Sequence, residues 1–219
     1  MSFAELWDRL HREHGVAAVV GTSAAGQGAA YYLDSGASDL RRVETAAGRR
    51  ADGLRVLDYG CGDGRVAYHT AAVAGSLVCA DASGDVLARC RTRLAGLSAQ
   101  TAQVEWPGGL ADDLRFDLVY SLAVAYHLTD LETFRLVRDV LPRLAPGGVF
   151  VFDICNVLHA DYGALLVKKT EVVDWKQPWP WVAQDAASIV RVALLFGYAS
   201  AEVPDPDARQ PLVVLRAAG

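Results

Sequence analysis

The chain has 219 residues, of which 52% are hydrophobic, and its formal net charge is −5 at pH 7. This length predicts one domain with a large core, and the acidic balance removes the attraction that supplies most non-specific nucleic-acid binding. No stretch reaches the ~18 uninterrupted apolar residues of a membrane span, and residues 2–14 mix acids, bases and histidines, unlike a secretory leader. We therefore expect a soluble cytoplasmic protein that binds neither nucleic acid nor membrane.

Two compositional features have structural interpretations. The four cysteines show no C-x-x-C spacing, so we expect mostly reduced, buried thiols. Arginines gather locally, and at helical spacing they are expected to form solvated faces; they are Arg41, Arg42, Arg49, Arg50, Arg55, Arg89, Arg91 and Arg93.

The first fifty residues predict two helices. Apolar residues recur at three- and four-residue steps over residues 3–14, which is typical of an amphipathic helix, here ending at Gly15. Residues 21–28 are loop-like, Tyr31 and Tyr32 follow, and a second helix is expected over 39–47. The spacing of His11 and His14 would suit a metal ion, but no third ligand is near in sequence, and we predict none.

Residues 56–67 read as a short buried strand, a glycine-rich turn and the start of a helix running to about residue 74. The spacing of Gly60, Gly62 and Gly64 is G-x-G-x-G, whereas a dinucleotide fingerprint has its third glycine one residue later. Asp58 ends the strand just before the turn, where a carboxylate would repel a pyrophosphate. The pattern therefore favours a ligand that carries positive charge.

The run from Asp58 to Gly64, Asp-Tyr-Gly-Cys-Gly-Asp-Gly, resembles the first motif of the class I S-adenosylmethionine-dependent methyltransferases. The resemblance implies that the glycine turn, Cys61 included, lies against the methionine part of the cofactor and that Asp58 faces its ammonium group. It also implies an α/β fold: a seven-stranded, mainly parallel sheet with helices on both faces and an antiparallel C-terminal hairpin.

The next strand is expected at residues 77–80 and ends at Asp81, followed by a helix that Ser83 or Asp85 caps and that runs to about residue 94. Asp81 lies 23 residues after Asp58. A carboxylate at the end of the second strand of a β-α-β unit is placed to bind ribose hydroxyls. The resemblance adds Ala82 to the cofactor site.

A third strand is predicted at residues 102–105. By resemblance, Glu105 and Trp106 match the adenine-binding positions loosely. The tryptophan could stack near the adenine or pack beneath the loop, and both alternatives stay open.

The fourth strand is predicted at residues 116–121, and Ser121 at its end is expected at the cofactor site. The following residues lack both the Asn/Asp-Pro-Pro-aromatic motif of amine-methylating relatives and the aspartate of metal-dependent catechol enzymes, so neither class is favoured. Asp153 and Asn156 without an acid at position 121 make an incomplete metal set. Tyr126 is a candidate substrate residue. His127 is the candidate general base, the alternative being a helix-start histidine bonded to a backbone carbonyl.

The rest of the chain completes the predicted fold. Thr129-x-x-Glu132 is a capping box that begins a helix ending near Pro142. A turn over 144–148, a strand over 149–152, a helix over 184–195 and strands over 200–203 and 212–215 follow. The resemblance covers about residues 50–156 and 184–216.

We therefore divide a single methyltransferase domain into four parts: an N-terminal helical lid (1–50), a cofactor-binding core (51–156), a substrate-side insertion (157–183) and a C-terminal helix and hairpin (184–219). The insertion holds Trp175, Trp179 and Trp181, which could form a substrate wall opposite Tyr31 and Tyr32 or a hydrophobic plug. In the first case the two tyrosines position the acceptor; in the second they pack against the core.

The expected function is methyl transfer from S-adenosylmethionine to an oxygen or nitrogen of a small organic molecule or peptide end, with S-adenosylhomocysteine as product and secondary metabolism as one setting. A non-catalytic binding protein with the same fold is the alternative. A nicotinamide-dependent oxidoreductase is the weaker rival among enzymes. No oligomeric state is predicted.

Overall fold

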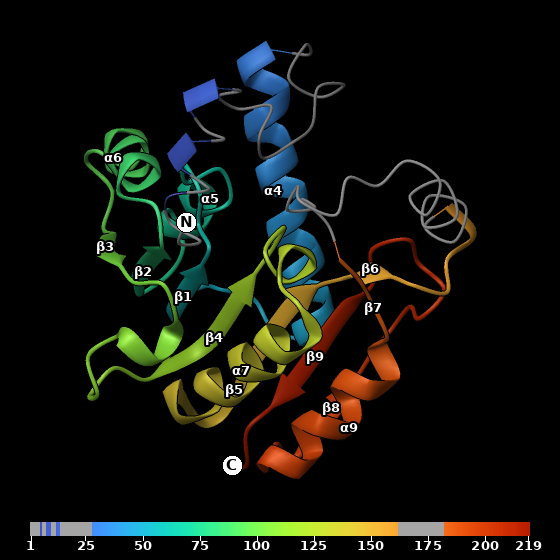
Figure 1. Cartoon of the computed structure of the whole chain (residues 1–219). Helices are drawn as coiled ribbons and strands as arrows, with labels where there is room; N and C mark the ends of the chain where they lie inside the picture. The colour runs from blue at the N-terminus through green and yellow to red at the C-terminus, as the bar shows by residue number, and fades with distance from the viewer. Residues whose placement is uncertain (1–4, 6–7, 10–11, 14–27, 162–181) are drawn as a thin grey trace.

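A computed structural model describes residues 5, 8–9, 12–13, 28–161 and 182–219. Its centre is a seven-stranded sheet in the order β3-β2-β1-β4-β5-β9-β8 (Figure 1). The strands are β1 Arg55–Tyr59, β2 Ser76–Asp81, β3 Gln100–Gln103, β4 Phe116–Ser121, β5 Leu144–Asp153, β8 Ser200–Glu202 and β9 Leu212–Arg216. The first five are parallel and β9 is antiparallel to both neighbours, which confirms the predicted fold.

The helices cover both faces of this sheet. α4 Gly28–Ala47, α5 Ala67–Ala71 and α6 Gly84–Arg93 pack on one face, and α7 Asp130–Val140 and α9 Ala186–Phe196 pack on the other (Figure 1). Single turns of 3₁₀-helix are η1 Pro107–Gly109, η2 Ala125–His127 and η3 Leu141–Arg143. A separate parallel pair, β6 Cys155–Asn156 and β7 Ala183–Gln184, lies beyond the end of β5.

The central strands are apolar on both faces, as a covered parallel sheet requires. Val56 and Leu118 belong to the cluster under α4, α5 and α6, whereas their neighbours Leu57 and Val119 belong to the cluster under α7 and α9. Successive side chains of a strand point to opposite faces, so the continuous apolar runs fill two cores at once.

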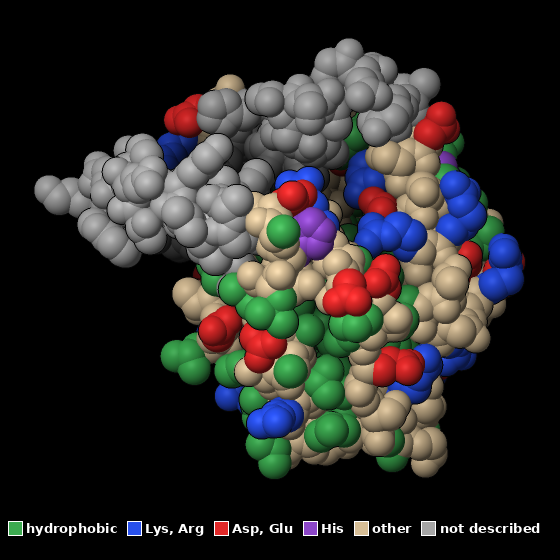
Figure 2. All heavy atoms as spheres, turned by 90° about the vertical axis from the view of Figure 1, so that its right-hand side faces the viewer, with side chains coloured by type: hydrophobic (Ala, Val, Ile, Leu, Met, Phe, Trp, Pro, Cys, Tyr) green, Lys and Arg blue, Asp and Glu red, His purple; other side chains and the backbone are tan. Residues whose placement is uncertain are grey.

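The expected caps form where the sequence places them. The Ser83 hydroxyl caps α6, and Thr129 and Glu132 form the capping box of α7. A further cap was not predicted: the Asp185 carboxylate caps α9. α9 ends at Gly197, whose φ of 104° suits glycine. Its last turn leaves Leu194, Leu195 and Phe196 exposed. Figure 2 shows hydrophobic side chains gathered on the lower half of the face that it draws.

Several element boundaries differ from the predictions. α4 begins at Gly28, eleven residues earlier than expected, so Tyr31 and Tyr32 lie inside the helix. Gly36 lowers helix propensity but lets α4 approach Arg65, because a Cβ at position 36 would lie 2.3 Å from the Arg65 carbonyl oxygen. Tertiary packing therefore extends the helix beyond its local signal.

Three other boundaries also shift. The helix after the glycine turn is only Ala67–Ala71, and β3 ends at Gln103, which leaves Glu105 and Trp106 beyond the strand. β5 begins at Leu144, within the predicted turn, with a register irregularity between Phe116 and Leu118 of β4.

The predicted helix over residues 3–14 lies mostly outside the described residues, although those described within it are helical. Among the described helices, none has the length and apolar character needed to cross a membrane.

Candidate active site

Four polar residues lie at one edge of the sheet, where the parallel strands have their carboxyl ends. Asp58 lies in β1, Asp81 ends β2, Ser121 ends β4 and Asp153 ends β5. This edge is where open α/β sheets bind ligands. The Ser121 hydroxyl is fully buried and has no hydrogen-bond partner within the described part of the chain.

The three glycines of the turn have positive φ but different neighbours. A Cβ at Gly60 would lie 2.1 Å from Val124 Cγ2, and one at Gly64 would lie 2.9 Å from Cys90 Sγ. Gly60 and Gly64 therefore permit close packing within the protein. At Gly62, where φ is 56°, a Cβ would have no atom of the described residues within 4 Å. Gly62 is the glycine that presents bare backbone to open space, as a cofactor-binding turn requires.

Asp58 is buried and held by a hydroxyl chain. The Tyr120 hydroxyl donates to Asp58 Oδ2 at 2.9 Å and lies 2.9 Å from the Thr70 hydroxyl. Burial raises the pKa of Asp58 to about 8, since the hydrogen bond from Tyr120 offsets only part of the desolvation. A cationic group placed beside Asp58 would stabilise its ionised form.

Asp81 links the turn to the second strand. Its Oδ2 accepts the Gly62 N–H at 3.0 Å, and its Oδ1 accepts the Ser83 N–H at 2.9 Å. Burial raises the pKa of Asp81, and these backbone donors oppose the rise. Each carboxylate oxygen has a second lone pair, so Asp81 can still accept hydroxyl donors. The Ser83 hydroxyl donates to Asp8, which brings the first helical residues beside this carboxylate.

The side chains of the residues expected beside the adenine do not point to one common site. Ala82 follows β2 and is partly buried, whereas the Glu105 side chain is exposed. The Glu105 carbonyl accepts the Tyr59 hydroxyl at 2.6 Å. The Trp106 ring lies 4.3 Å from the Arg135 guanidinium and packs on the cluster under α7. This arrangement favours the packing alternative for Trp106.

A network between α4 and the glycine turn was not predicted. The Tyr32 hydroxyl donates to Asp63 at 2.5 Å, and Arg93 binds the same carboxylate at 2.6 Å. Arg65 binds Asp39 of α4 at 2.7 Å. The interpretation of Arg93 as part of a solvated face was wrong, because its partner is the buried Asp63. No local sequence pattern links Tyr32 and Asp63, which lie 31 positions apart.

Tyr32 also narrows the cavity at the turn. With Asp58, Gly62 and Ala123 it lines a space of about 30 Å³, which holds on the order of one water molecule. The side chain of Tyr31 is outside the described residues, as are Trp175, Trp179 and Trp181. The predicted aromatic walls therefore stay predictions, and Tyr32 is placed at the cofactor turn.

The loop after β4 carries the candidate catalytic residues. Ala123 has a φ of 61°, and its N–H donates to Asp153 Oδ1 at 2.8 Å. Burial raises the pKa of Asp153 to about 6. His127 is half-buried in η2 with its ring centroid 4.5 Å from that of Tyr126, which is itself buried against Cys155.

Asp153 was considered from sequence only as a metal ligand. Asp153 lies at the same edge of the sheet as Asp58 and Asp81. This position could have indicated a role other than metal binding. The Asn156 amide donates to the carbonyls of Pro206 and Ala208, and so holds the β8–β9 turn.

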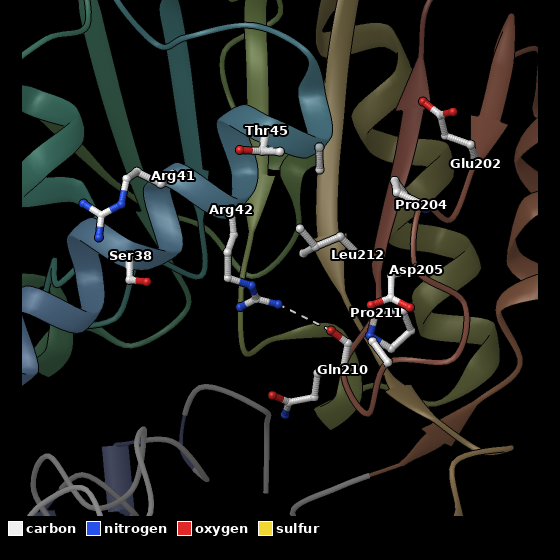
Figure 3. Close-up of a pocket in the computed structure, with 12 residues that line it drawn as sticks. Ser38, Arg41, Arg42, Thr45, Glu202, Pro204, Asp205, Gln210, Pro211 and Leu212 are labelled. Atoms are coloured by element: carbon white, nitrogen blue, oxygen red, sulfur yellow. Dashed lines mark hydrogen bonds between the residues drawn. The ribbon is translucent and has the colours of Figure 1, made fainter.

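A larger groove lies on the other side of α4. It has a volume of about 700 Å³ between α4 and the β8–β9 turn (Figure 3). Arg41 and Arg42 line it from the helix, and Glu202 and Asp205 line it from the hairpin. Arg42 reaches across to the Gln210 carbonyl at 3.4 Å. The mixed charges give this groove no strong preference for one ligand charge.

Comparison with known proteins agrees with this geometry. Residues 57–150 match the family model described as a methyltransferase domain. The chain is 33% identical over 154 residues to a ubiquinone biosynthesis O-methyltransferase of Chelativorans sp. strain BNC1, covering 67% of this chain and 57% of the relative. Identity to the protein of that name from Rhizobium johnstonii is 32% over 134 residues, covering 60% and 53%. The chain thus spans little more than half the length of these curated relatives.

Solved structures share the fold. The DhpI–SAH complex aligns over 100% of this chain and 99% of its own, with a TM-score of 0.66 and 17% identity. Magnesium protoporphyrin IX methyltransferase from Synechocystis PCC 6803, with bound SAH, aligns over 85% and 84%, with a TM-score of 0.64 and 16% identity. Residues 57–150 match a methyltransferase domain, the curated relatives are named methyltransferases and the solved structures share the fold, so the comparisons confirm the predicted resemblance to the class I S-adenosylmethionine-dependent methyltransferases.

Proposed function

We propose that the protein transfers a methyl group from S-adenosylmethionine to an oxygen atom of a small organic acceptor. The observation that carries the proposal is the pair of carboxyl groups, the buried Asp58 and the half-buried Asp81, on either side of a glycine turn that Asp81 itself holds through Gly62. A purely structural domain has no need of carboxyl groups at both places. The curated relatives are named O-methyltransferases, which supports oxygen over nitrogen as the acceptor atom.

The residues present fit the cofactor. Asp58 would face its ammonium group, Gly62 offers bare backbone to its methionine part, and Asp81 retains lone pairs for its ribose hydroxyls. Ser121 adds a buried hydroxyl without a partner in the described part of the chain. Tyr32, which donates to Asp63, also lines the small space at the turn together with Asp58 and Gly62.

When bound, S-adenosylmethionine supplies a methyl group that its sulfonium has already activated. The chain must then hold the acceptor oxygen in line and remove its proton where the hydroxyl is not already ionised. His127 is the proposed general base, and Asp153, with a pKa of about 6, is a second group at the same loop that can take up a proton near neutral pH. The acceptor would contact Tyr126 and the 157–183 insertion, and it is proposed to be a small molecule.

Calorimetry with S-adenosylhomocysteine tests the cofactor assignment. We expect one site per chain in the parent. Asp81→Ala should weaken binding by about 2 kcal/mol, the scale of lost hydrogen bonds to a charged acceptor. Asp85→Ala is the matched control, because Asp85 lies four residues further on and its carboxylate is exposed and paired with Arg12. Absence of binding to the parent would refute the assignment, and binding of NAD instead would support the oxidoreductase alternative.

A methylation assay tests the acceptor. Release of S-adenosylhomocysteine is measured with a panel of phenols, aliphatic alcohols, amines and amino-terminal peptides. We expect turnover with hydroxyl compounds and little with amines. Turnover confined to amines would contradict the oxygen assignment while leaving the cofactor assignment intact.

A further inference from the structure

Three of the four cysteines lie together beneath the glycine turn. Cys61 comes from the turn itself, Cys79 from β2 and Cys90 from α6, and all three are buried free thiols. Their sulfur atoms lie within 4.8 Å of one another, and the Cys61 and Cys90 sulfurs are 4.0 Å apart. Neither cofactor binding nor the proposed chemistry requires this convergence of sulfur.

The separation of the sulfurs suits a bound ion. Metal–thiolate bonds are about 2.3 Å long, so three sulfurs around an ion at the centre of their plane are about 4.0 Å apart. The Cys61–Cys90 separation has this value. The group can therefore close around an ion with only small side-chain rotations.

The surroundings of the group suit a soft metal ion. The three thiols belong to an apolar cluster with Val66 and Leu87, and the Cys61 thiol donates to Cys90 Sγ. Sulfur is polarizable and is the ligand type that soft metal ions prefer.

We propose that Cys61, Cys79 and Cys90 form a three-coordinate site for a soft monovalent metal ion of the Cu(I) class. Soft thiolate ligands select Cu(I) and zinc, but structural zinc sites take four ligands. Within the described residues, no fourth Cys, His, Asp or Glu joins the group. The ion would bind a lone pair of each of the three sulfurs, and three soft ligands without a fourth suit Cu(I). No electron is transferred, and any thiol proton that leaves goes to the buffer.

The test is a titration of the full-length reduced protein with Cu(I) under anaerobic conditions, in competition with a chromogenic Cu(I) chelator. We expect one ion per chain. Loss of an outer-sphere partner already costs 10- to 100-fold in metal affinity, so Cys79→Ser and Cys90→Ser should each weaken Cu(I) binding by at least about 100-fold. Cys155→Ser is the matched control, because Cys155 is buried in a separate cluster with Tyr126, and it should leave the affinity unchanged.

Two further measurements keep the result interpretable. Circular dichroism and thermal melting establish that each serine variant is folded, and X-ray absorption of the loaded protein should show three sulfur neighbours at about 2.3 Å. Absence of stoichiometric Cu(I) binding by the reduced parent, retention of full affinity in folded Cys90→Ser, or binding of Zn(II) alone would each overturn the site. Calorimetry with S-adenosylhomocysteine on the same samples reports the proposed function separately.

Discussion

Asp58→Asn should make the protein more stable, and increasingly so as the pH rises. Asp58 is 3% exposed, and its carboxyl accepts a hydrogen bond from Tyr120. Burial raises its pKa to about 8, against about 3.9 in an unfolded chain. The folded protein therefore binds a proton that the unfolded chain releases between about pH 4 and pH 8. The contribution of Asp58 to the free energy of unfolding is fully present below pH 4. It falls as the pH rises and is lost once the pH passes 8.

The magnitude follows from the same two pKa values. A group of this kind changes the free energy of unfolding by about 1.4 kcal/mol per pH unit inside its window. Between pH 5.5 and pH 8.5 the parent should therefore lose about 3 kcal/mol through Asp58 alone. Asparagine has nearly the same shape, can accept the Tyr120 hydroxyl and does not titrate. The stability advantage of Asp58→Asn should grow by that amount over this range.

Urea denaturation of parent and variant at intervals between pH 5.5 and 8.5 measures this difference. Asp117→Asn is the control. Arg55 lowers the pKa of Asp117, so the contribution of Asp117 to stability is lost only as the pH falls through acid values. The stability difference between the parent and Asp117→Asn should therefore not change above pH 5.5. A difference for Asp58→Asn that does not change with pH would refute the assignment of a raised pKa to Asp58.

Three further predictions concern the site. S-adenosylhomocysteine binding at pH 7 should release close to one proton, because the ligand ammonium favours the ionised form of Asp58. The calorimetric enthalpy of binding should then depend on the ionisation enthalpy of the buffer. No such dependence would mean that Asp58 does not face the ammonium. Gly60→Ala should destabilise the fold by about 2 kcal/mol or more because the new Cβ meets Val124. Gly62→Ala should cost about 1 kcal/mol in backbone strain and mainly weaken S-adenosylhomocysteine binding. Equal losses of stability in the two variants would contradict their different roles. His127→Ala should lower turnover by about 100-fold or more with cofactor affinity intact, and turnover within about threefold of the parent would end its assignment as general base.

Local pattern predicted the sheet well because its strands are buried on both faces. β4 has the predicted bounds, Phe116–Ser121, and the caps at Ser83 and Thr129 form as expected. In each case a short apolar run or a capping side chain carries the information within a few residues. Boundaries failed where a distant contact decides them, as at α4, which the packing of Gly36 on Arg65 extends.

The candidate site shows the same division. Asp58 and Asp81 could be identified because each lies at or next to the end of a strand, beside a recognisable turn. The contact between Tyr32 and Asp63 joins residues 31 positions apart, and the convergence of Cys61, Cys79 and Cys90 depends on the register of a strand and a helix. Neither has a local pattern, so only the folded chain reveals them. Asp153 was visible but was considered as a metal ligand alone.

The Asp63 carboxylate lies between Tyr32 of α4 and Arg93 of α6, and it is buried. Replacing either partner alone would leave a charge or a hydroxyl unsatisfied in the interior, a cost of several kcal/mol for a buried ion pair that loses one member. Substitutions at these three positions should therefore be tolerated together and not singly. Among related sequences they should covary, so that a neutral residue between the second and third glycines accompanies loss of both the tyrosine and the arginine.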